Sequence, residues 1–185
     1  IKGNALDGTM DISGSYSTAE SKKKPEISLT YDVKNLDIEK TFYAFNTVQK
    51  LMPIGKFIAG RLNSQLTMKG KLGENMMPDL TSLTGNGSLL LIKGFLSKFK
   101  PLEELAQTIN VKELYQLSLK EVKNYIEFTN GRVMVKPFKF RVKEIEMEIG
   151  GFHGFNQSLD YTINLKVPRS LMGEKGNTFI NDLVS

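Results

Sequence analysis

The chain has 185 residues, of which 40% are hydrophobic and 24% charged, so it should fold into a single domain spanning 1–185. It has no cysteine, which excludes disulfides and cysteine metal sites, and one histidine, which leaves zinc or iron only carboxylates, poor ligands for these metals. The net charge is +5, but the two signs are interspersed and the only tight basic run, 22–24, is typical of a solvated loop. A nucleic-acid site would need a clustered basic patch with stacking aromatics. We therefore expect no metal, no cofactor and no nucleic-acid partner.

Strands are predicted wherever apolar and polar residues alternate, because period-two alternation puts one residue class on each face of a strand. This pattern occurs at 27–33 and 62–72, and a further strand is predicted at 88–92, where a short apolar run follows Gly85-Asn86-Gly87. Residues 1–20 are rich in Gly, Ser and Thr and suit one strand, or two short ones turning near 7–8.

One long helix is predicted over 39–52. Asn35 or Asp37 would cap it, and proline 53 would end it. Phe42, Phe45 and Met52 recur at helical spacing, so we expect this stripe to lie on the sheet.

Further helices are predicted later in the chain. Residues 101–109 begin with proline and two early acids and stop at Asn110, and a second short helix follows at 111–117. Residues 169–176 are predicted to form a loop and 178–184 a helix.

The second half contains the clearest hairpins. Asn130-Gly131 separates two short apolar runs and is the favoured dipeptide for a two-residue turn. Residues 138–149 alternate throughout, with a turn expected near 143–144, and a glycine-rich break at 150–154 precedes another strand at 161–167. These patterns predict an α+β fold: a mainly antiparallel, strongly curved β-sheet with three or four short helices packed on one face.

Two groups of residues are candidates for a catalytic site. His153 lies in a glycine-rich segment that reads as a surface turn, and no nucleophile or orienting carboxylate is recognisable near it. Glu144, Glu146 and Glu148 alternate with apolar residues and fall opposite the basic residues of 139–143 across the expected hairpin, so cross-strand pairing is favoured over glycosidase chemistry. We expect no catalytic residue.

The apolar face of the 138–167 stretch is the candidate site. Its members alternate with polar residues on each strand and are Phe138, Phe140, Val142, Ile145, Met147, Ile149, Tyr161, Ile163, Leu165 and Val167. One interpretation is an ordinary core beneath the helices. The other is a groove for acyl chains, since a sheet face larger than its helices can cover stays partly open. Alternation alone favours the core.

Five stretches consist mainly of strand and turn residues, at 66–72, 77–89, 128–138, 151–161 and 167–171. In their order and spacing they resemble the C-terminal region of AsmA-family envelope proteins, particularly the Bacteroidetes version. They are spread between residues 66 and 171, and they make the groove interpretation the favoured one.

The resemblance implies a periplasmic, non-enzymatic protein that takes part in outer-membrane assembly and is anchored in the inner membrane by an N-terminal helix. The chain starts with Ile1 rather than Met, so we expect it to be a segment of a longer protein whose anchor would precede it. Relatives of this family are similar to bridge-like proteins whose β-sheets carry phospholipid in a hydrophobic groove. The expected partner is therefore phospholipid or another acyl-chain lipid, with other envelope proteins as further partners.

Two alternatives stay open. The chain could be a scaffold module that binds another envelope protein along a strand edge. It could also be a glycan hydrolase that uses the glutamates, which we consider the weakest of the three.

Overall fold

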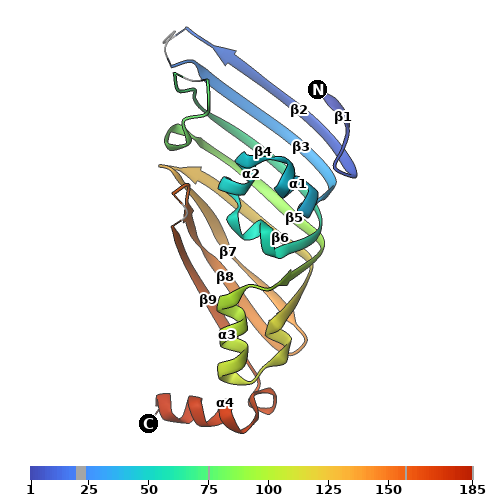
Figure 1. The fold of residues 1–185 in the computed structure, drawn as a ribbon, viewed down its shortest axis with the longest axis vertical. Helices are drawn as coiled ribbons and strands as arrows, with labels where there is room; N and C mark the ends of the chain where they lie inside the picture. The colour runs from blue at the N-terminus through green and yellow to red at the C-terminus, as the bar shows by residue number, and fades with distance from the viewer. Residues whose placement is uncertain (20–23, 75, 157, 185) are drawn as a thin grey trace.

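The computed structural model describes residues 1–19, 24–74, 76–156 and 158–184. Within these ranges the strands form a single antiparallel sheet in which sequence neighbours are spatial neighbours, β1 to β9 in order (Figure 1). The strands are β1 (Lys2–Ala5), β2 (Gly8–Ser17), β3 (Glu26–Asp37), β4 (Ile58–Lys71), β5 (Thr84–Ser97), β6 (Gln116–Thr129), β7 (Arg132–Val142), β8 (Ile145–Gly154) and β9 (Leu159–Lys166). The sheet is open, with β1 and β9 at its edges. The expected mainly antiparallel sheet with accompanying helices is therefore confirmed.

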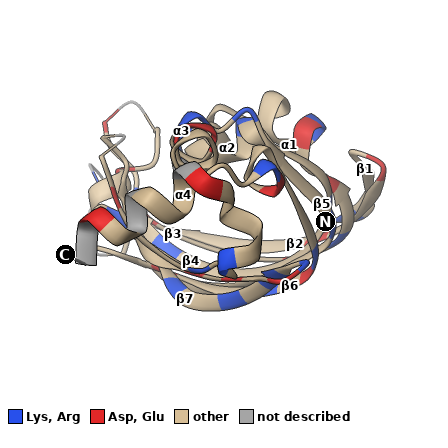
Figure 2. Ribbon diagram, turned by 90° about the horizontal axis from the view of Figure 1, so that it is seen from below, with Lys and Arg blue, Asp and Glu red and all other residues tan. Residues whose placement is uncertain are grey.

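The helices lie between strands in the chain, except for α4, which follows β9. They are α1 (Ile38–Ala44), α2 (Asn46–Leu51), η1 (Pro53–Phe57), η2 (Leu80–Ser82), α3 (Lys100–Ile109), η3 (Lys112–Tyr115) and α4 (Arg169–Val184). Figure 1 shows α1 and α2 in front of β4 to β6, and α3 in front of one end of β7 to β9. Seen along the sheet in Figure 2, these helices lie on one side and many of the charged strand residues on the other. We call the helix side the inner face.

Two apolar clusters occupy the inner face. The larger one joins the helices to the sheet. It includes strand residues, Leu36, Leu62, Leu91, Leu117 and Ile145, and residues of α3, Leu102, Ala106 and Ile109. The smaller one contains Leu66, Met68, Phe128 and Val133, toward the opposite ends of the same strands. Burying these side chains is worth about 1.5–3 kcal/mol each, so the two clusters hold the sheet and its helices together.

Most predicted turns and caps are confirmed. Asn130 and Gly131 both have positive φ, as a type I′ turn requires, and Lys143 turns the β7–β8 hairpin. Asp37 caps α1 by accepting a hydrogen bond from the Lys40 backbone at 2.9 Å. Asn110 ends α3 in the left-handed conformation. The predicted basic loop at 22–24 falls largely outside the described residues.

The predicted helix over 39–52 is wrong as a single element. Phe45 adopts an extended conformation, φ −129° and ψ 111°, and separates α1 from α2. As a result Phe42 is buried, while Phe45 is 44% exposed and does not join the stripe on the sheet. Pro53 begins η1.

Two other predictions are corrected in the second half. Residues 111–117 form only the short turn η3, and Leu117 already belongs to β6. The predicted loop at 169–176 is helical and forms the first part of α4, with a kink at Gly173 where φ is 65°. The glycines in this segment predicted a loop. In the structure Gly176 packs against the Ile109 carbonyl oxygen, and its lack of a side chain lets α4 approach α3 closely.

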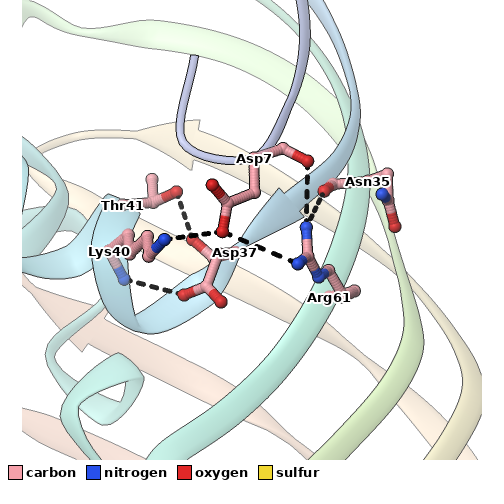
Figure 3. A network of polar contacts seen from close by, with 6 residues as sticks. All are labelled: Asp7, Asn35, Asp37, Lys40, Thr41 and Arg61. Atoms are coloured by element: carbon pink, nitrogen blue, oxygen red, sulfur yellow. Dashed lines mark hydrogen bonds and ion pairs between the residues drawn. The ribbon is translucent and has the colours of Figure 1, made fainter.

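A polar network fastens the β1–β2 turn to the start of α1 (Figure 3). Lys40 of α1 donates to the Asp7 carboxylate at 2.6 Å, and Arg61 of β4 lies 3.7 Å from the same carboxylate. Arg61 also donates to the backbone carbonyls of Asp7 and Asn35, at 2.9 and 3.0 Å. The network thus ties β2, β3, β4 and α1 together at one corner of the sheet.

The network makes stability depend on pH at this corner. The hydrogen bond from Lys40 holds the pKa of the Asp7 carboxyl below its ordinary value, with support from the charges of Lys40 and Arg61. The unfolded chain, with a carboxyl pKa of about 4, therefore takes up this proton first as the pH falls. The stabilisation is present above pH 4 and is lost as the pH drops through the lower folded value.

We predict that Asp7→Asn lowers the melting temperature slightly at pH 7 and that the difference shrinks as the pH falls below 4; asparagine tolerates the positive φ at this position. Thermal unfolding of both proteins at several pH values measures the difference. Lys40→Gln should behave in the same way, and the double variant should add little to either. A difference that is constant across the pH range would rule out this ion pair as its source.

Candidate functional site

All ten predicted site residues lie on the inner face or at its margin, but the structure divides them. Val142, Ile145 and Met147 are 8%, 0% and 1% exposed. These three lie around the β7–β8 turn and belong to the larger cluster, which also contains Leu102, Ala106 and Ile109 of α3. This part of the predicted site is sealed core, and the groove interpretation does not apply to it.

The other site residues are half-buried. We define the open strip as the predicted site residues on the inner face of β7 to β9 that are half-buried: Phe138, Phe140, Ile149, Tyr161, Ile163 and Leu165. Val167 is also half-buried but follows the end of β9. The strip therefore holds six of the ten predicted residues.

Strand register makes the open strip continuous. Phe138 pairs with Ile149, which pairs in turn with Ile163 on β9. One step along, Phe140 and Leu165 flank the sealed Met147. The Phe138 and Phe140 rings stack with their centroids 5.6 Å apart. Two adjacent rows of apolar side chains thus cross three strands.

The helices cover only part of β7 to β9. In Figure 1, α1 and α2 lie over the middle strands and α3 over the turn end of β7 to β9, and the stretch of β7 to β9 between them has no helix in front of it. Phe140, Ile149, Ile163 and Leu165 pack against the larger cluster and are still only half-buried. A contiguous row of apolar side chains that stays partly exposed is a candidate binding surface.

A glycine interrupts the inner-face side chains of β8 at one point. Gly151 lies between Val135 and Tyr161, at an inner-face position where the neighbouring strands carry side chains. Its φ of +152° and the nearby Asp160 carbonyl oxygen leave no room for a side chain. Glycine is therefore required here for β8 to pair closely with β9.

His153 and Tyr161 form a polar end to the apolar strip. The prediction that His153 sits in a surface turn is wrong, because β8 continues through the glycine pair and buries the ring to 4% exposure. His153 Nδ1 lies 2.9 Å from the Tyr161 hydroxyl, and the rings stack nearly parallel. Burial raises the pKa of Tyr161 to about 12, so the phenol stays neutral at physiological pH. Tyr161 therefore places a neutral hydroxyl group beside apolar carbon.

The glutamates that could have suggested hydrolysis lie on the opposite face. Arg141 donates to the Glu146 carboxylate, Lys166 lies 3.6 Å from it, and Lys139 lies 3.9 Å from Glu148. The hydrogen bond from Arg141 lowers the pKa of Glu146, which is the opposite direction from a general acid. The predicted cross-strand pairing is confirmed for these two glutamates, while Lys143 pairs instead with Glu113 of η3 at 2.9 Å.

Other surface features do not adjoin the strip. One shallow depression runs along α4, from Arg169 to Asn181, and another surrounds the β1–β2 turn near Asp7 and Asn35. Across the described parts of the chain, no three His, Asp or Glu side chains gather to hold a metal ion. No helix among those residues is both long and apolar enough to cross a membrane.

Comparison with known proteins gives no further guide to the site. No family model matches the chain, and neither the curated proteins nor the solved structures yielded a match.

The division of the inner face predicts unequal costs for equal truncations. Ile145→Ala should lower the free energy of unfolding by about 2–5 kcal/mol, because it empties space inside the sealed cluster. Ile163→Ala should cost less than half as much, because its side chain is already partly in water. Chemical denaturation of both variants measures the two values. Equal costs would mean that Ile163 is core and that the strip is closed.

Proposed function

We propose that this chain is a non-enzymatic envelope-biogenesis protein that contributes to outer-membrane assembly by binding or passing phospholipid along the inner face of its sheet. The observation that carries the proposal is the open strip, an apolar surface on a folded sheet that the helices do not cover. The lipid tails would lie on the strip and the headgroups would face water.

The chemistry of the strip suits acyl chains. Its members are aliphatic or aromatic, and the inner-face positions of β7 to β9 contain no Asp, Glu, Lys or Arg. Each methylene removed from water contributes about 0.8 kcal/mol, so a few contacts with an acyl chain offset the cost of ordering it. The Tyr161 hydroxyl beside His153 gives a polar group at one end, where an ester or headgroup oxygen could accept a hydrogen bond.

The proposed setting follows from the resemblance to AsmA-family proteins. In that setting the protein is periplasmic and is held to the inner membrane by a segment preceding Ile1. Strong curvature of the sheet, with the apolar face on its concave side, is part of the proposal. A bent sheet would wrap acyl chains, and the larger protein would continue the groove toward the other membrane.

A scaffold role is the second candidate, and the open edges of the sheet favour it. β9 pairs with β8 on one side and has no strand on its other side among the described residues. An exposed edge strand can take a strand from another protein through backbone hydrogen bonds. In that case an envelope protein, rather than lipid, would be the ligand.

The lipid proposal predicts a face-specific effect of charge on β9. Ile163→Glu or Leu165→Glu should weaken the binding of a fluorescent phospholipid about tenfold or more, because an unpaired carboxylate would be placed against the acyl chain. Thr162→Glu and Asn164→Glu are the matched controls, since these neighbours point to the opposite face of the same strand. They should bind the probe as the unchanged protein does.

Two results would contradict the proposal. One is equal binding by all four variants and the unchanged protein. The other is unfolding of the Ile163 and Leu165 variants, shown by circular dichroism, which would make these residues core. Capture of an envelope protein together with no phospholipid in the purified sample would favour the scaffold role.

A further inference from the structure

The edge strand β9 has a symmetric pattern of residue types. Its eight residues, Leu159–Lys166, are followed directly by Val167. Ile163 is the centre of the pattern. Tyr161 and Leu165 flank it on the inner face, and Thr162 and Asn164 on the outer face. Asp160 and Lys166 lie three positions to either side, with opposite charges.

We propose that β9 pairs antiparallel with β9 of a second copy of this chain, around a two-fold axis at Ile163. In this register Asp160 of each copy faces Lys166 of the other, Thr162 faces Asn164, and Tyr161 faces Leu165. Opposite charges and hydroxyl or amide groups thus meet on the outer face, and apolar side chains meet on the inner face.

The neighbouring registers are less favourable. A slip by two residues in either direction separates Asp160 from Lys166 and leaves both charges without a cross-strand partner at the junction. A slip by one residue would place the apolar face of one copy on the polar side of the other. Charge complementarity therefore selects one register.

The exposure of the edge agrees with a missing partner strand. Leu159 is 59% exposed, although its position in the register is on the inner face, and the proposed pairing places it against Val167 of the other copy. The Lys166 side chain is 84% exposed and only 3.6 Å from Glu146, so it can reach Asp160 of the second copy while keeping its own partner. Asp160 is exposed and takes part in none of the ion pairs found among the described residues.

Pairing in this register would make one sheet from two. Both inner faces would lie on the same side, and the open strips, which end at β9 in each copy, would adjoin across the two-fold axis. The inference stands on the edge of the sheet and holds whether or not the inner face binds lipid.

Charge exchange tests the pairing directly. The unchanged protein should form a dimer in sedimentation velocity. Asp160→Lys alone and Lys166→Asp alone should each raise the dissociation constant about tenfold or more, because each places like charges opposite one another twice. An equimolar mixture of the two single variants should form dimers again, since every junction pair in the mixed dimer is then Lys opposite Asp. The double variant should also form dimers.

A crosslink tests the position of the axis. The chain has no cysteine, so Ile163→Cys introduces a single thiol, which on the axis would face its own copy. It should join to a covalent dimer with a short thiol-specific reagent. Tyr16→Cys on β2, where the native side chain is 54% exposed, is the control and should stay monomeric in a denaturing gel.

Several outcomes would overturn the inference. They are a monomer up to the solubility limit, a dimer that the charge exchanges leave unchanged, and equal crosslinking of the control. Larger open-ended assemblies would mean that β9 pairs with the other edge of the sheet. Phospholipid binding that persists in Asp160→Lys and is lost in Phe138→Glu would keep the two proposals separate, because Phe138 lies on β7, away from the edge.

Discussion

The structure depends on period-two alternation carried through one continuous antiparallel sheet. Because each strand pairs with its neighbours in the chain, the apolar residues of every strand fall on the same side, and that side is large. The helices inserted between strands are short, and together they cover the middle strands and one end of β7 to β9. The helices are too small for the sheet they accompany, and the open strip is what remains.

Sealed and half-buried apolar residues on neighbouring strands contribute unequally to stability. Ile145 and Met147 of β8 belong to the larger cluster, which also contains residues of α3, and stabilise the fold. Ile163 and Leu165 of the adjacent β9 are half-buried and should add less to stability. Under the proposed function, their apolar side chains also contact the acyl chain. Under the proposed dimer, Leu159 at the edge, which is 59% exposed, is covered by the second copy.

The strands and turns could be predicted from the sequence, but which apolar strand residues the helices bury could not. Alternation and Asn130-Gly131 predict the hairpins, because those signals are local. Whether Ile145 is sealed and Ile163 open depends on where α3 packs, and nothing in the local pattern carries that information. His153 could have been placed correctly, since counting in twos from Ile145 through Gly151 reaches it on the inner face. Gly150 and Gly151 predicted a break in the strand. In the structure β8 continues through both, because Gly151 fits closely against the Asp160 carbonyl oxygen of β9.

The most direct test of the account is paramagnetic broadening by a phospholipid that carries a spin label deep in its acyl chain. With methyl groups of isoleucine and leucine observed by NMR, the account predicts strong broadening at Ile149, Ile163 and Leu165 and little at Ile145 beneath α3. Broadening spread evenly over exposed methyl groups, or none at all, would contradict the claim that the uncovered part of the inner face receives acyl chains.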